Sequence, residues 1–106
     1  MNLEKFTIKS QEAIQQAQQV AMDNEHQMID TSHLLKGILE VDENVLPYIF
    51  KKSGVSPDRI APALDLVLQQ LPKVSGAKQY LSDDANKALQ KAMQKAQSLN
   101  DEFVSI

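Results

Sequence analysis

The sequence of 106 residues contains no cysteine and no tryptophan, and it has only three glycines and four prolines. The absence of cysteine excludes a disulfide scaffold, a thiolate metal site and a cysteine nucleophile. No apolar run approaches the roughly 20 residues that a membrane-spanning helix needs. The first residues also lack the basic start and long apolar stretch of a secretory signal peptide. We therefore expect a cytoplasmic protein without a membrane partner.

Positive charge is neither abundant nor clustered in this chain. Lys and Arg number 11 against 14 Asp and Glu, which gives a formal net charge of −3. Because nucleic-acid binding needs clustered cations, no nucleic-acid partner is expected. The hydrophobic fraction of 42% is ordinary for a globular protein, and Ala, Gln, Leu and Lys predominate. This composition predicts one small all-α domain.

Capping residues and apolar periodicity predict five helices. The first spans about 8–24, with Thr7 as its N-cap. The second follows Asp30 or Thr31, and Leu34, Leu35, Ile38 and Leu39 are expected to form its buried stripe. It contains Gly37, for which close packing against another backbone is the simplest reason. The third spans about 45–52, with Gly54 as the residue that ends it, and the fourth begins after Ser56 and ends before Pro72. Residues 73–81 are predicted to form an extended linker before the fifth helix. Its apolar face would be formed by Ala85, Ala88, Leu89, Ala92, Ala96 and Leu99.

An internal repeat appears when the sequence is shifted by 75 positions. Thr7 then falls on Ser82, so that one predicted N-cap matches another. The apolar pair 28–29, which follows a polar turn, falls on Phe103 and Val104. The second copy stops at Ile106, the position that corresponds to Thr31. An incomplete second repeat predicts uncovered apolar surface near Leu89, Phe103 and Val104, and hence low stability or self-association.

The second predicted helix carries a recognisable motif. Its residues are Thr31-Ser32-His33-Leu34-Leu35-Lys36-Gly37-Ile38-Leu39. Together with the two repeats, this motif resembles the N-terminal domain of Clp-family AAA+ unfoldases. The opening MNLEKFT and the linker LPKVSGAKQYLS (71–82) are most similar to the ClpB-type disaggregases. The resemblance implies an all-α Clp N-terminal domain, a pseudo-twofold repeat of four-helix units whose second repeat is incomplete here. The first repeat would span 1–72, the linker 73–81, and the start of the second repeat 82–106.

The same resemblance implies a function in protein handling. The domain would be a protein-binding accessory unit that engages unfolded or aggregated clients before an AAA+ ring threads them. The parent protein would be a homohexamer that uses ATP and magnesium in downstream modules. This domain itself would have no enzymatic activity, cofactor or metal, and it contains no G-x-x-x-x-G-K-[ST] phosphate loop. One alternative is an adaptor- or substrate-docking domain of a ClpA- or ClpC-type protease unfoldase. A small helical enzyme is the other, although no nucleophile–base set supports it.

Five residues are candidates for client binding. The resemblance associates Thr7 and Asp101 with chaperone function, although a helix cap and a turn residue are the plainer interpretations. Leu89, Met93 and Phe103 are the apolar candidates.

Two departures from the family pattern limit what the resemblance carries over. Lys91 and Lys95 stand where some relatives have leucines. Ser32 replaces the acid that ClpC-type relatives use for phosphoarginine, so that activity is not expected here.

The two histidines are the remaining candidates for chemistry. His26 and His33 lie seven positions apart, and no cysteine is available to complete a metal site. Because metal sites use three or four ligands, we interpret both as structural residues near a helix start.

Overall fold

The computed structural model describes residues 3–74, 76 and 78–106. These residues form five helices and two strands of two residues each. In chain order they are α1 (Ile8–Asp23), β1 (Met28–Ile29), α2 (Thr31–Val41), α3 (Val45–Ser53), α4 (Pro57–Gln69), β2 (Tyr80–Leu81) and α5 (Asp83–Ser98). The predicted all-α class is confirmed, although β2 lies within the stretch predicted as linker. Positions 75 and 77 of that predicted linker lie outside the described residues.

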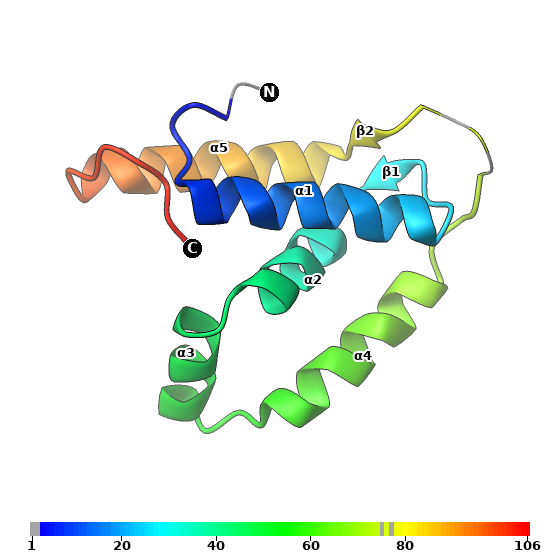
Figure 1. Cartoon of the computed structure of the whole chain (residues 1–106), viewed down its shortest axis with the longest axis horizontal. Helices are drawn as coiled ribbons and strands as arrows, with labels where there is room; N and C mark the ends of the chain where they lie inside the picture. Colours follow the sequence, from blue (N-terminus) through cyan, green and yellow to red (C-terminus); the bar gives the residue numbers. More distant parts are fainter. Residues whose placement is uncertain (1–2, 75, 77) are drawn as a thin grey trace.

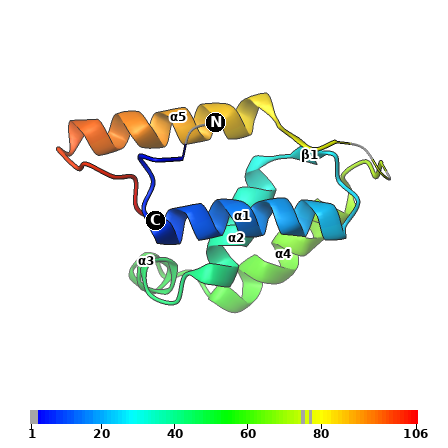
Figure 2. The same cartoon turned by 45° about the horizontal axis from the view of Figure 1, so that its top comes forward.

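Helices α1 and α5 run antiparallel to each other in both views (Figures 1 and 2). Helix α2 crosses α1, and α3 and α4 lie on the opposite side of α2 from α5 (Figure 1). A buried apolar cluster joins α1 and α5 through Phe6, Ile14, Leu89, Ala96 and Val104. The pair α1 and α5 therefore lies on one side of α2, and α3 and α4 lie on the other (Figure 1).

Local capping chemistry sets where the helices begin. The Thr7 hydroxyl accepts a hydrogen bond from the Ser10 N–H at 3.1 Å. The Ser82 hydroxyl accepts one from the Ala85 N–H at 3.0 Å. Both predicted caps are confirmed. Helix α4 begins at Pro57 as predicted, but the Ser56 side chain makes no capping hydrogen bond.

Gly37 lies where α2 crosses α1. A Cβ atom added at this glycine would stand 2.2 Å from the Ala13 carbonyl oxygen and 2.9 Å from the Ala17 nitrogen. The predicted close approach of two backbones is therefore confirmed. Because Gly37 and two small alanines form the contact, the axes of α1 and α2 can come unusually near each other.

The two halves of the chain are joined by strand pairs at both ends of α1. Strand β1 pairs with β2 in parallel, with Ile29 opposite Leu81. At the other end, Phe6 forms a parallel bridge with Val104. A shift of 75 positions converts one pair into the other, since Phe6 corresponds to Leu81 and Ile29 to Val104. The sequence repeat therefore has a counterpart in the backbone pairing.

Backbone hydrogen bonds recur at the same spacing. The His26 N–H donates to the Ala21 carbonyl, and the Asp101 N–H donates to the Ala96 carbonyl, both at 2.8 Å. The residue before each donor adopts a positive φ, 58° at Glu25 and 59° at Asn100. The polar turn that ends α1 is thus rebuilt after α5, with the same geometry.

Several predicted core positions are not where periodicity placed them. Leu99, expected on the apolar face of α5, is 60% exposed, and Leu35 of α2 is 36% exposed. Leu89 and Val104 are themselves buried, but both line an open apolar groove, so the predicted uncovered apolar surface lies beside them. Both also pack with Phe6 in the cluster between α1 and α5. Of the three residues in that prediction, only Phe103 is exposed, at 45%.

Candidate functional site

An apolar groove of about 300 Å³ lies between α1, α2, α5 and the last residues of the chain. The side chains that α2 and α5 contribute are Leu34, Leu35, Ile38, Ala88, Leu89 and Ala92. Ser10, Thr31 and Ser105 supply its few polar groups. A groove with this lining offers dispersion and burial of apolar surface, with little hydrogen-bonding specificity.

The predicted apolar candidates lie at different distances from this groove. Leu89 forms part of its wall. Met93 is half-buried and packs against the cluster that contains Leu89. Phe103 is exposed and does not line the groove. The structure therefore brings Leu89 and Met93 together and leaves Phe103 apart from them.

The predicted polar candidates lie outside the groove. The Thr7 hydroxyl donates to the Ser10 hydroxyl at 3.0 Å and borders a separate pocket of mixed polarity, together with Asp42 and Val45. Asp101 is exposed, and its backbone N–H closes the turn after α5 by donating to Ala96. Capping and turn formation account for the contacts of both residues.

Sequence reasoning missed the groove side of α2. Leu35 and Ile38 were expected to be buried, but they line the open groove. The signal that could have revealed this is the small size of the α1 face. Because Gly37 contacts Ala13 and Ala17, the larger apolar side chains of α2 must lie to either side of that contact.

A chain of hydrogen bonds joins the histidines to the start of α2. The Asp30 N–H donates to His33 Nδ1 at 2.9 Å, so this nitrogen carries no proton. The Nε2–H of neutral His33 therefore donates to His26 Nδ1, which lies 2.8 Å away. His26 Nε2 then carries a proton and, within the described part of the chain, has no hydrogen-bond partner. The interpretation of both histidines as structural residues agrees with this arrangement.

Both imidazoles are held neutral in the folded protein. Burial lowers the pKa of His26, and the Lys73 charge lowers it further. Burial and His26 lower the pKa of His33, against a smaller opposite effect of Asp30. The hydrogen-bond geometry also favours the neutral imidazoles, because a second proton on either ring would place two N–H groups face to face.

The histidine pair predicts that acid weakens the fold. Between the lowered folded pKa values and the unfolded value near 6.5, the unfolded chain binds more protons. The free energy of unfolding should therefore fall as the pH drops below about 6.5. The slope is up to about 1.4 kcal/mol per pH unit for each proton that the unfolded chain binds in excess of the folded chain. Urea unfolding at pH 7.5 and 5.5 measures this slope. The double variant His26→Gln/His33→Gln serves as the control and should lose most of it, whereas an equal slope in both proteins would contradict the prediction.

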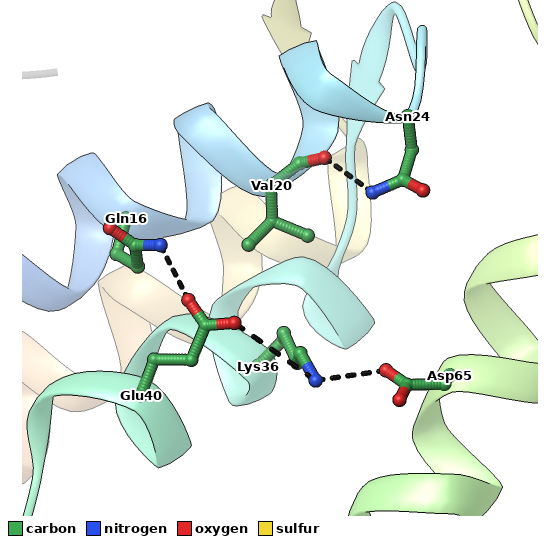
Figure 3. Close-up of polar contacts among 6 residues, drawn as sticks. All are labelled: Gln16, Val20, Asn24, Lys36, Glu40 and Asp65. Atoms are coloured by element: carbon green, nitrogen blue, oxygen red, sulfur yellow. Dashed lines mark hydrogen bonds and ion pairs between the residues drawn. The ribbon is translucent and has the colours of Figure 1, made fainter.

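A polar cluster connects α1, α2 and α4 on another side of the molecule (Figure 3). Lys36 Nζ lies 2.9 Å from an Asp65 oxygen and 4.0 Å from a Glu40 oxygen. Gln16 donates to the same Glu40 carboxylate. Since each charge has a partner, the cluster is explained by the docking of three helices.

The described residues hold neither a metal-binding cluster nor a membrane-spanning helix. No three His, Cys, Asp or Glu side chains gather there in a way that could hold a metal ion. Among the helices of the same residues, none is long and apolar enough to span a bilayer. The apolar groove is therefore the candidate site that the geometry supports best.

The fold is that of the N-terminal domains of Clp-type ATPases. The N-terminal domain (1–163) of the ClpV1 ATPase from E. coli superposes with a TM-score of 0.88 at 22% identity, over 96% of this chain and 63% of that chain. The Hsp104 N-terminal domain from Candida albicans gives a TM-score of 0.84 at 19% identity, over 96% of this chain and 68% of the other. At these identities the likeness shows the architecture alone.

Sequence comparison shows the family. Residues 5–106 match the model of the Clp repeat (R) N-terminal domain, and the chain belongs to this family. The chaperone protein ClpB of Bacteroides thetaiotaomicron is 44% identical over 106 residues, and that of Porphyromonas gingivalis is 40% identical over 106 residues. Each alignment covers 100% of this chain and 12% of the relative, so the chain spans about one eighth of the length of these proteins.

Proposed function

We propose that this domain binds exposed apolar segments of unfolded or aggregated polypeptides, as the accessory domain of a ClpB-type disaggregase. The observation that carries the proposal is the open apolar groove between α1, α2 and α5. Its volume of about 300 Å³ is at the low end of the roughly 300–1,000 Å³ that ligand pockets span. It therefore has room for a few side chains and none for a folded element.

Weak binding follows from this size. A buried Leu or Phe side chain contributes about 1.5–3 kcal/mol, and ordering an unfolded chain opposes that gain. Two such side chains correspond to a dissociation constant on the order of millimolar. Weak binding suits an accessory domain, because a client must be released to the next stage.

The parent protein is proposed to supply the remaining functions. It would be a cytoplasmic homohexamer whose downstream AAA+ modules use ATP and magnesium to thread the client. The relatives named ClpB support this proposal. The recurrence of caps, turns and strand pairs at a spacing of 75 residues supports the division into a first repeat over 1–72 and the start of a second over 82–106.

A titration monitored by NMR tests the groove. The probe is an unstructured peptide rich in Leu and Phe, added to ¹⁵N-labelled protein. We expect shift changes at the α2 and α5 positions that line the groove, and we expect Leu35→Ser to reduce them at least about fivefold. The matched control is Leu66→Ser, because Leu66 is exposed on α4 and does not line the groove. Shift changes confined to other surfaces, or equal in the two variants, would contradict the proposal.

The same titration also tests the five residues predicted to bind clients. Leu89 and Met93 should respond to the peptide, because Leu89 lines the groove and Met93 packs against its cluster. Phe103, Thr7 and Asp101 are proposed to contact longer clients that extend beyond the groove. A longer peptide that shifts none of these three would remove them from the site.

A further inference from the structure

A second apolar surface lies on α3, away from the groove. Val45, Tyr48, Ile49 and Lys52 occupy positions i, i+3, i+4 and i+7, so they share one face of the helix. Val45 is 39% exposed, Tyr48 63% and Ile49 45%. Lys52 Nζ lies 5.7 Å from the centroid of the Tyr48 ring. These four residues are called the α3 stripe.

Helix α3 is fixed mainly by backbone contacts at its two ends and little by burial of its side chains. The Asp42 carboxylate accepts hydrogen bonds from the N–H groups of Asn44 and Val45 at 3.2 and 3.1 Å, and also from that of Leu46. Gly54 ends the helix in the left-handed conformation, with φ 72°. No residue of α3 is buried. The apolar side chains of the α3 stripe therefore contribute little to the core of this domain.

The composition of the stripe is that of an interaction surface. Single exposed apolar side chains are normal on a protein surface. Here three of them lie in one row, and Tyr is one of the residue types that dominate binding at interfaces. Val55, which follows the helix in the sequence, is also exposed, at 39%.

Cations lie on helix α3 and after it, whereas Asp42 and Glu43 lie before it. Residues 45–60 contain Lys51, Lys52 and Arg59 against a single acid, Asp58, whereas the formal net charge of the chain is −3. The ion pairs formed within the described residues involve Lys9 and Lys36, and leave these three cations out. Their charges are therefore free to attract an acidic partner.

We propose that the α3 stripe docks an amphipathic helix of another polypeptide, whose apolar side is bordered by Asp or Glu residues. A convex row on one helix packs against a similar row on a second helix by ridges into grooves. Lys51 and Lys52 then face the acids of the partner, and Tyr48 and Ile49 face its apolar row.

Charge favours this occupant over a lipid surface. The stripe is short and is bordered by Asp42 and Glu43 before it and by Asp58 after it. Those acids would be repelled by anionic headgroups. A polypeptide helix can place its own acids beside Lys51 and Lys52 and avoid the acidic ends.

The test uses a synthetic 20-residue amphipathic helix, with one apolar Leu row bordered by Glu and a fluorescein label. We expect fluorescence anisotropy to show saturable binding that weakens as salt is raised. The variants Lys51→Glu/Lys52→Glu and Tyr48→Ala/Ile49→Ser should each raise the dissociation constant at least about tenfold. The matched control is Lys91→Glu/Lys95→Glu, which makes the same charge change at exposed positions of α5 and should bind normally.

Four outcomes would overturn the proposal. The first is equal binding of a peptide that carries Lys in place of each Glu. The second is NMR shift changes at Leu35 and Ile38 in place of Tyr48 and Ile49, which would assign the peptide to the groove. The third is binding of phosphatidylserine vesicles without binding of the peptide. The fourth is a concentration-dependent dimer by sedimentation that the Tyr48→Ala/Ile49→Ser variant abolishes, which would make a second copy the occupant.

This experiment is independent of the groove. Leu35→Ser should leave binding of the acidic helix unchanged, and the α3 variants should leave the groove titration unchanged. Because all substituted side chains are exposed, the variants should melt within a few degrees of the parent. Failure of one proposal therefore leaves the other standing.

Discussion

Replacing Gly37 by Ala is expected to destabilise the domain by about 3 kcal/mol or more. Overpacking a core typically costs about 1–3 kcal/mol, and here the new methyl group meets backbone, which cannot rotate away. The added Cβ would stand 2.2 Å from the Ala13 oxygen and 2.9 Å from the Ala17 nitrogen. This cost outweighs the gain of up to about 1 kcal/mol in helix propensity that the exchange would give in an isolated helix. Urea or thermal unfolding measures the difference.

Gly54 provides the matched control for this substitution. It also lies next to a helix, but nothing lies within 4 Å of a Cβ added there. Gly54→Ala should therefore cost only the roughly 1–2 kcal/mol of placing a side chain at positive φ. If Gly37→Ala unfolded at the same denaturant concentration as the parent, α1 and α2 could separate without penalty, and the close approach would not stabilise the fold.

Replacing His33 by Ala is expected to cost about 4 kcal/mol or more. His33 is fully buried, so its removal leaves a cavity and two unpaired groups, the Asp30 N–H and His26 Nδ1. A large-to-small core change typically costs about 2–5 kcal/mol, and an unsatisfied buried polar group adds about 1–3 kcal/mol. Because natural domains are stable by only about 5–15 kcal/mol, this variant should be near the limit of folding.

The conservative variant His33→Gln separates hydrogen bonding from volume. Position 33 is the third residue of α2, where a Gln side chain usually bonds back to the N-cap N–H. Gln can therefore restore the bond to Asp30 but not the bond to His26, and it should recover about half of the loss. Equal stabilities of the Ala and Gln variants would indicate that cavity formation alone accounts for the cost.

The effect of His33 should extend to the other half of the molecule. Asp30 Oδ1 accepts a hydrogen bond from the Ser82 hydroxyl at 2.8 Å, and that hydroxyl caps α5 through Ala85. Loss of the bond at the Asp30 N–H should loosen this connection. Hydrogen exchange at the Ala85 amide should therefore be faster in His33→Ala than in Leu66→Ser, which serves as a reference with an exposed substitution.

Local chemistry made much of this fold predictable. The caps at Thr7 and Ser82 and the glycine end of α3 depend on residues within four positions of each other, so their residue types are sufficient to recognise them. The repeat was visible because the two helices share cap, turn and apolar pair at one spacing. The close contact at Gly37 was predictable since a glycine inside a helix is costly without such a reason.

Other features depended on residues that are far apart in the sequence. The strand pairs at Ile29–Leu81 and Phe6–Val104 join segments separated by about 50 and 100 residues, and two-residue strands have no periodicity to detect. The bond between His26 and His33 was missed for a different reason. A spacing of seven residues does not reveal this bond, because the bond depends on how the turn before β1 folds onto α2.

The candidate site was predicted in part. Leu89 was identified from the sequence, but Leu35 and Ile38 were assigned to the core because apolar periodicity marks a face without saying what covers it. The α3 stripe has the same pattern and the same ambiguity. Whether the roles of Thr7, Asp101 and Phe103 extend to clients stays a prediction.

The sequence by itself determined where the helices begin and end and which of their faces are apolar. It also determined that two parts of the chain form an internal repeat. These properties arise from interactions between near neighbours, such as caps, turns and helical spacing. Only the tertiary structure decided which apolar faces are covered and which form an open groove or an exposed stripe. Burial is decided by how closely the helix axes approach, and here that distance was set by a few small residues where α2 crosses α1.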